Sequence, residues 1–223
     1  MFVKICGFTD PANLVAICEA KERPDAIGLN LWSGSKRYVS DGAGAGLACI
    51  ARERGVASWA VTVNMPPKAL TETPERYGVD GLQLHGDEPP SALATARRAA
   101  PEDGGVVVRA WRVEGSLDPL LAHLEQVASQ DRPDYVLLDA AVPGAYGGTG
   151  AKLDWHALRG ELDRVGESLP PVILAGGLTP ENVAEAVRIV RPWGVDAAGG
   201  VESAPGIKDP AKVAAFCEAA RSA

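Results

Sequence analysis

Eight short apolar runs recur along this 223-residue chain, and their spacing constrains the fold more than any other feature of the sequence. Their first residues lie 22 to 37 positions apart, which leaves room each time for one helix and two short loops. Alternating strands and helices favour a parallel sheet, and eight such units favour its closure into a barrel. The predicted strands are Val3–Cys6, Ala26–Leu31, Ser58–Val63, Gly81–Leu84, Val106–Trp111, Tyr135–Asp139, Val172–Ala175 and Gly194–Ala197. We therefore predict an α/β protein with one domain over residues 1–223, a (β/α)8 or TIM barrel of eight parallel strands.

The segments between the runs have the spacing of amphipathic helices. After Thr179, with Pro180 at the first helical position, apolar residues follow at the i, i+3, i+4 and i+7 positions of one face. Similar patterns follow Asp10-Pro11 and Asp209-Pro210. Residues 41–54 contain three glycines, so we expect a helix there that is short or begins late.

Composition and charge argue against several classes of protein. The formal net charge is −7, so long-range attraction to nucleic acid or to anionic lipid is not expected. No apolar run approaches the ~18 residues that a membrane span needs, and the first residues enter a strand rather than a signal peptide. The four cysteines, Cys6, Cys18, Cys49 and Cys217, are scattered without a C-x-x-C pair, which predicts neither a zinc site nor disulfides. We therefore expect a cytoplasmic protein that holds no metal and binds neither nucleic acid nor membranes.

Strand side chains alternate between two faces, so the apolar positions of each run assign its polar positions to the barrel interior. In the first run Val3 and Ile5 would face the helices, which leaves Lys4 and Cys6 inside. The same argument places further polar side chains inward: Asn30, Gln83, His85, Arg109, Asp139 and Asp196. Such an interior is costly unless its polar groups are paired or functional.

Two of these inward residues have more than one interpretation. Closure of the barrel makes the first and last strands neighbours, so Lys4 would either pair with Asp196 or contact a substrate directly. His85 lies at a strand end, either as a functional residue or as a hydrogen-bonded histidine of the rim.

Cys6 and Asp139 are the candidates for catalysis. Each ends a predicted strand, and each leads into glycine, at Gly7 or in the glycine-rich loop at residues 145–150. Active sites of such barrels lie at the C-terminal ends of the strands, where an acid beside a thiol suits acid–base chemistry. A thiol has an ordinary pKa of about 8.5, so thiolate character needs a local donor or a positive charge. Single strand-end residues of these types are usually structural, but their glycine-rich surroundings favour a site.

Glycine-rich segments also follow the last two strands, at residues 175–179 and 198–201. Glycine lets backbone N–H groups approach an anion closely, and a helix N-terminus adds its dipole. In barrels these two loops often hold phosphate; the alternative is that the glycines only make tight turns. Arg37, in the loop after the second strand, could grip a carboxylate with two hydrogen bonds or be a solvated loop arginine.

Taken together, motifs that span nearly the whole chain closely resemble the phosphoribosylanthranilate isomerase family of tryptophan biosynthesis. The motifs are Lys4-Ile5-Cys6-Gly7, Ser35–Val39, Leu82–Gly86, Leu137–Asp139, Gly147–Gly150, Asp154-Trp155, Leu174–Leu178, Gly194–Asp196 with Gly200–Glu202, and Pro205–Asp209. Each motif is weakly specific alone, and their combination in this order is highly specific.

The resemblance implies a cofactor-independent Amadori rearrangement of N-(5-phosphoribosyl)anthranilate by a monomer or homodimer. Asp139 would act as the general acid and Cys6 as the general base. The implied substrate-binding residues are Arg37 for the anthranilate carboxylate, the amides near Gly177, Gly199 and Gly200 for the phosphate, and His85 and Asp196. Ala198-Gly199 stands where two serines are common in the family, so backbone amides alone would bind the phosphate at that point.

Two alternatives remain at the level of sequence. One is another phosphosugar-binding barrel enzyme, of the ribulose-phosphate epimerase or thiamine-phosphate synthase type, which would lack the pairing of Cys6 with Asp139. The other is a non-catalytic phosphate-binding barrel.

Overall fold

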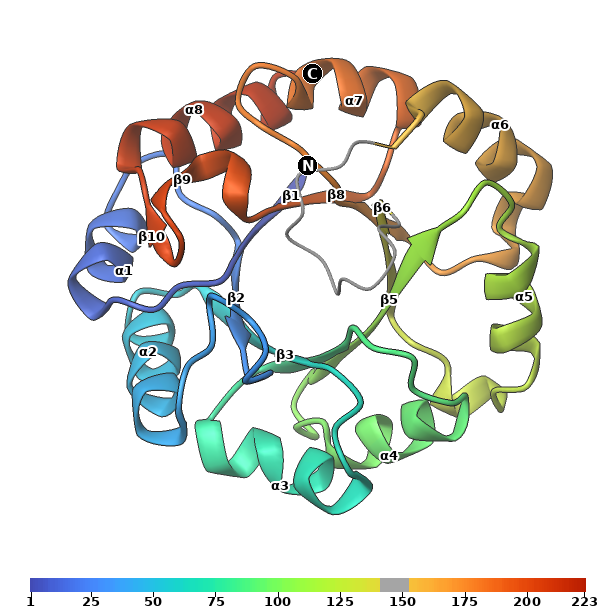
Figure 1. The fold of residues 1–223 in the computed structure, drawn as a ribbon, viewed down its shortest axis with the longest axis horizontal. Helices are drawn as coiled ribbons and strands as arrows, with labels where there is room; N and C mark the ends of the chain where they lie inside the picture. The colour runs from blue at the N-terminus through green and yellow to red at the C-terminus, as the bar shows by residue number, and fades with distance from the viewer. Residues whose placement is uncertain (141–152) are drawn as a thin grey trace.

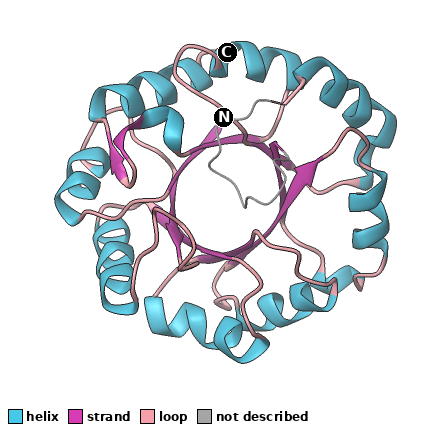
Figure 2. Cartoon of the chain, in the orientation of Figure 1, coloured by secondary structure: helices cyan, strands magenta, loops and turns pink. Residues whose placement is uncertain are grey.

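A computed structural model describes residues 1–140 and 153–223. Within these residues the strands β1 to β8 form a closed barrel in which every neighbouring pair is parallel. Figure 1 shows the barrel from one end, and Figure 2 shows the ring of helices outside the ring of strands. The predicted TIM barrel is confirmed.

Each predicted strand is present, and its observed ends lie within two residues of the prediction. The strands are β1 Phe2–Cys6, β2 Ala26–Asn30, β3 Ala57–Thr62, β4 Gly81–Leu84, β5 Val106–Val113, β6 Tyr135–Ala140, β7 Val172–Leu174 and β8 Gly194–Ala197. The helices are α1 Pro11–Cys18, α2 Asp41–Glu53, α3 Pro67–Tyr77, α4 Ser91–Ala99, α5 Asp118–Glu125, α6 Trp155–Val165, α7 Val183–Val190 and α8 Pro210–Arg221. Short 3-10 turns occur at η1 Ser129–Asp131, η2 Gly166–Ser168 and η3 Gly199–Val201, and a small hairpin joins β9 Glu202–Ala204 to β10 Ile207–Lys208.

Apolar side chains form two separate layers on the two faces of the barrel. Outward residues such as Val3, Ile5 and Leu82 belong to the large core that packs under the helices. Inside, a smaller cluster includes Val108 and Leu137.

Stacked aromatic rings lie at the end of the barrel where the strands begin. Phe2 stacks on Trp59 and on Trp193, with centroid distances of 5.4 and 4.7 Å. Tyr135 stacks on the same two tryptophans, at 6.2 and 4.1 Å. These rings form the floor of the barrel, below the polar layer.

Strand alternation predicted the polar interior with one error. Lys4, Gln83, Asp139 and Asp196 are buried on the inward face. Arg109 is not inward: it pairs in register with Leu84, which belongs to the helix-facing core, so its side chain leaves the barrel on the outside. There it finds Glu88, with 2.7 Å between guanidinium and carboxylate.

The expectation of a short or late helix at residues 41–54 is wrong, because α2 begins at Asp41 and continues to Glu53. Packing overrides the low helix propensity of glycine here. A Cβ at Gly44 would lie 2.8 Å from two ring carbons of Tyr77, so the absent side chain makes room for that ring. The Tyr77 hydroxyl in turn donates a hydrogen bond to Asp41, at the start of the same helix.

Among the described residues, no helix combines the length and the apolar character needed to cross a bilayer.

The two glycines Gly44 and Gly46 give a matched test of this packing. Gly46 is exposed with nothing near its missing Cβ, so Gly46→Ala should stabilise the protein by about 0.5–1 kcal/mol. Gly44→Ala should destabilise it, because the Tyr77 ring must shift, and overpacking of this kind costs about 1–3 kcal/mol. Urea unfolding of both variants measures the difference; equal effects would contradict the packing role of Gly44.

Candidate active site

Because all strands of the barrel are parallel, the residues at their C-terminal ends meet at one mouth. Cys6 ends β1, Asp139 is the penultimate residue of β6, and Asp196 is the penultimate residue of β8. His85 directly follows β4. The structure thus brings the predicted acid and the predicted base to the same face of the protein.

A chain of polar groups leads to Asp139. The Nε2 atom of His85 lies 3.6 Å from the Oδ2 atom of Asp139. On the other side of the ring, the Nδ1 atom of His85 lies 2.8 Å from the side-chain amide nitrogen of Gln83. If this amide donates to Nδ1, the neutral ring carries its proton on Nε2, which faces Asp139. The second oxygen of Asp139 accepts a hydrogen bond from the backbone of Ala140 at 2.8 Å. His85 therefore lies beside the carboxylate, whether or not it also touches a substrate.

Cys6 lies among charged groups. Burial raises the pKa of its thiol, and three cations, Lys4, Lys208 and Arg37, act in the opposite direction. The carboxylate of Asp196 adds to the effect of burial. The thiolate of Cys6 thus depends on how these charges are arranged.

Lys4 and Asp196 form a buried ion pair with 3.0 Å between the Nζ and Oδ1 atoms. Lys4 has no exposed surface. Burial alone would lower its pKa, but Asp196 and Cys6 outweigh burial and raise it. Of the two interpretations of Lys4, the structure favours the ion pair.

Arg37 is held by a carboxylate that the sequence reasoning did not single out. Glu202 accepts hydrogen bonds from the Nε and Nη2 atoms of Arg37 at 2.7 and 2.6 Å. These bonds are the main cause of the raised pKa of Arg37. The side chain of Arg37 lies against Gly7, whose missing Cβ would be 2.3 Å from its Cδ atom.

Lys208, which is 1% exposed, completes this network. Its Nζ atom donates to Glu202 at 2.7 Å, to the carbonyl of Cys6 at 2.6 Å and to the carbonyl of Ala198 at 3.3 Å. Glu202 and Lys208 stand inside motifs of the family resemblance, which was the only signal in the sequence for their importance.

The two glycine-rich loops after β7 and β8 pack backbone against backbone. A Cβ at Gly200 would lie 2.0 Å from the carbonyl oxygen of Leu178, so only glycine allows this approach. Gly177 has a φ of +63°, and its carbonyl accepts a hydrogen bond from the Asn182 side chain at 3.0 Å. Gly199 lies at the start of η3, beside the guanidinium of Arg37.

The helix after the first of these loops begins later than predicted. Helix α7 starts at Val183 rather than at Pro180. The side chain of Asn182 accepts a hydrogen bond from the backbone of Thr179 at 2.8 Å and so shapes the preceding turn. The predicted glycine-rich loop at residues 145–150 lies outside the described residues.

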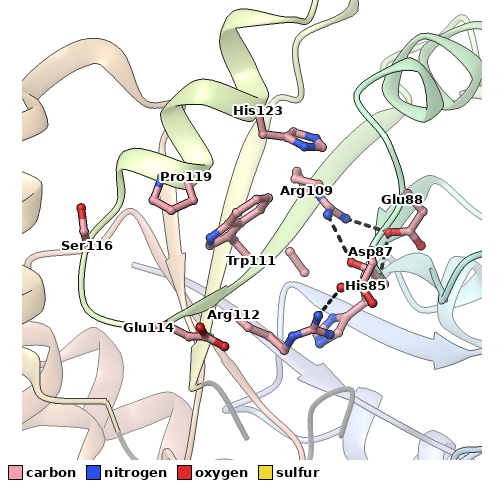
Figure 3. Close-up of a pocket in the computed structure, with 12 residues that line it drawn as sticks. His85, Asp87, Glu88, Arg109, Trp111, Arg112, Glu114, Ser116, Pro119 and His123 are labelled. Carbon is pink, nitrogen blue, oxygen red and sulfur yellow. Dashed lines mark hydrogen bonds and ion pairs between the residues drawn. The ribbon is translucent and has the colours of Figure 1, made fainter. Parts of the chain in front are cut away.

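A pocket of about 410 Å³ extends from His85 at the site to Pro119 and His123 of α5. Figure 3 shows Arg109 between Trp111 and the side chain of Glu88, with His123 of α5 nearby. The guanidinium of Arg109 lies 5.4 Å from the centre of the Trp111 ring. Burial and Arg109 lower the pKa of His123 to about 4, so this histidine is neutral at physiological pH. Arg109 therefore has a structural role on the helix-facing side of the barrel, where it contacts Glu88 and Trp111.

Comparison with known proteins identifies the family of this chain. The model of the N-(5′-phosphoribosyl)anthranilate (PRA) isomerase family matches residues 3–219. The chain belongs to this family. It is 44% identical over 220 residues to the N-(5′-phosphoribosyl)anthranilate isomerase of Myxococcus xanthus, an alignment that covers 99% of this chain and 96% of the relative.

Solved structures of the family have the same architecture. A phosphoribosylanthranilate isomerase in complex with reduced 1-(o-carboxyphenylamino)-1-deoxyribulose 5-phosphate is 27% identical, with a TM-score of 0.78 and 100% coverage of both chains. Monomers generated from the dimeric isomerase of Thermotoga maritima are also 27% identical, with a TM-score of 0.79 and 100% coverage of both chains. Family membership confirms the predicted isomerase and decides against the other phosphosugar barrels.

The described residues contain no cluster of three or more His, Cys, Asp or Glu side chains that could hold a metal ion.

The close contact of the two glycine-rich loops generates a paired test. Gly200→Ala should lower the unfolding free energy by about 1–3 kcal/mol and raise KM for the phosphorylated substrate, because the new Cβ drives the loops apart. Gly199→Ala should do much less, because its Cβ would meet the flexible end of Arg37 at 3.3 Å and the Glu202 carboxylate at an ordinary contact distance of 3.9 Å. Thermal unfolding and steady-state kinetics measure both effects; an undisturbed Gly200→Ala enzyme would refute the contact.

Proposed function

We propose that this isomerase of tryptophan biosynthesis converts N-(5-phosphoribosyl)anthranilate to 1-(2-carboxyphenylamino)-1-deoxyribulose 5-phosphate with Asp139 as general acid and Cys6 as general base. The observation that carries the assignment is the meeting of a thiol on β1 and a carboxyl group on β6 at one mouth of a family barrel. A solved relative that binds the reduced product supports the substrate class.

The rearrangement needs one proton donor and one proton acceptor. Asp139 donates a proton to the ring oxygen of the ribose, which breaks the bond between that oxygen and C1′ and gives a Schiff base. Cys6, as thiolate, then removes the proton from C2′, and the electron pair moves to form the enolamine. Tautomerisation of the enolamine to the ketone completes an isomerisation that leaves the atoms of the substrate unchanged in number.

The surroundings of each group suit its role. Asp139 is 8% exposed, lies beside His85 and accepts a hydrogen bond from the Ala140 amide, which leaves it held at the mouth where a proton is needed. Burial raises the pKa of the Cys6 thiol, and three nearby cations act to lower it. Activity should therefore rise with pH as the thiol ionises.

The remaining proposed contacts hold the two ends of the substrate. Arg37, oriented by Glu202, binds the anthranilate carboxylate. Amides near Gly177, Gly199 and Gly200 bind the phosphate, while His85 and Asp196 contact the sugar. The reaction uses no cofactor in this scheme.

The proposal also includes a cellular compartment and an oligomeric state for the enzyme. All four cysteines are free thiols, which fits the reducing cytoplasm. The chain would act as a monomer or as a homodimer; the isomerase of Thermotoga maritima is dimeric.

The acid and base roles predict that Asp139→Asn and Cys6→Ala each lower kcat by at least about a hundredfold, which is the scale of general acid–base catalysis. Cys49→Ala, which removes an exposed thiol from α2, serves as the control and should keep normal activity. The assay follows the loss of phosphoribosylanthranilate fluorescence with purified protein. Near-normal kcat in both site variants would remove the assigned roles, and an inactive parent chain would favour the non-catalytic alternative.

The role of Arg37 predicts a raised KM in Arg37→Ala, with a smaller effect on kcat, because a bidentate contact to the carboxylate is lost. Lys36→Ala removes a neighbouring exposed cation and should leave KM close to normal. If KM changes equally in both variants, the effect is one of general charge and the contact is refuted.

A further inference from the structure

Lys4 and Cys6 both lie next to Gly28, a residue without a side chain on the neighbouring strand. Both are on the inward face of β1, two residues apart. Across from them on β2, a Cβ at Gly28 would lie 2.6 Å from the sulfur of Cys6 and 3.1 Å from the Nζ atom of Lys4. The glycine therefore leaves space that the thiol and the ammonium group share.

The ion pair with Asp196 does not use all the donors of Lys4. An ammonium group has three protons to donate. The Nζ atom of Lys4 is completely buried, and although it lies 3.0 Å from Asp196, it has no hydrogen bond of good geometry within the described part of the chain. Beneath it the Trp59 ring lies 6.0 Å away and offers only a weak cation–π contact. The unused donor capacity of Lys4 lies in the same space as the sulfur.

Stability alone does not explain this arrangement. A buried ion pair loses hydration energy, and replacing it by apolar side chains is often neutral or stabilising. The interior of this barrel already contains an apolar layer, with Val108, Leu137 and Ile173.

The other charges that face Cys6 are already engaged elsewhere. Arg37, from the loop after β2, is held by both oxygens of Glu202. Lys208, from β10, is bound to Glu202 and to two backbone carbonyls. Asp196, from β8, opposes the three cations. Lys4 is the charge whose position is best suited to act on the thiol itself.

We propose that the Lys4–Asp196 pair is a positioning device for Cys6, in which Lys4 holds the sulfur over Gly28 and favours its thiolate while Asp196 limits that effect. Its consequence for turnover rests on the proposed role of Cys6 as the base. The positioning itself does not. Burial raises the pKa of Cys6, and Lys4 exerts the strongest opposing influence.

The test removes the charge with Lys4→Met, which keeps an unbranched side chain. Wild type and variant are treated briefly with iodoacetamide across a pH series, and alkylation of each cysteine is quantified by mass spectrometry. The midpoint for Cys6 should rise by about one pH unit or more, because loss of an adjacent opposite charge has effects of that size. Cys49, exposed on α2, is the internal control and should keep its midpoint. An unchanged midpoint for Cys6 would overturn the proposal.

Asp196→Asn tests the ion pair by removing the charge of its acidic partner. It also replaces Lys4→Met as the test if that variant does not fold. Here the midpoint for Cys6 should fall, because the carboxylate no longer opposes the thiolate or occupies Lys4. A midpoint that stays or rises contradicts the proposal.

Kinetics on the same variants separate this inference from the proposed function. In Lys4→Met, kcat at neutral pH should fall about tenfold, in step with a one-unit rise in the pKa of the thiol, and recover at higher pH. If the loss of kcat came from a general structural defect, raising the pH would not restore it. If alkylation of Cys6 shifts and the pH profile of kcat does not, the positioning role stands and Cys6 is not the base. If kcat falls and alkylation is unchanged, the positioning role is refuted.

Discussion

The pairing of the first strand with the last is the interaction on which this structure depends. β1 and β8 align Lys4 with Asp196, residues that lie at opposite ends of the chain. A shift of that pairing by one residue would exchange the inward and outward faces of a strand, because side chains alternate with a period of two. The ion pair, the position of Cys6 and its distance from the loop after β8 all follow from this one register.

A single carboxylate outside the barrel strands also connects distant parts of the chain. Glu202 contacts two cations, and through them it connects the loop after β2, the end of β1 and the loop after β8. Its pKa is lowered because the hydrogen bonds from Arg37 and Lys208 outweigh the opposing effect of burial. The segments that we propose to bind the two ends of the substrate are therefore mechanically and electrostatically coupled.

The sequence was most informative where structure is local and periodic. Eight strands could be placed from apolar runs, and alternation placed Lys4, Cys6 and Asp139 correctly, because each sits beside clearly apolar neighbours of the opposite face. Arg109 was misplaced because β5 begins with three consecutive valines, so alternation gives no direction there. Its partner Glu88 comes from another loop, a contact that no local pattern reveals.

Helix α2 and Glu202 show the same limit. The three glycines of α2 suggested a weak helix, but the ring of Tyr77, from α3, turns one of them into a packing requirement. Glu202 is an ordinary acidic residue by its local sequence, and only the folded chain brings Arg37 and Lys208 to it. The missed features thus come from contacts between segments distant in the sequence.

The aromatic floor has a consequence for the catalytic cycle. Phe2, Trp59, Tyr135 and Trp193 fill the barrel opposite the mouth, and an apolar layer lies above them. Each turnover in the proposed mechanism leaves the thiol with a proton and the carboxyl group without one. Because these rings and the apolar layer separate the polar layer from the far end of the barrel, we expect the pair to be recharged through the mouth, by way of the product or of water that enters as the product leaves. Regeneration of the enzyme is thereby tied to emptying of the site.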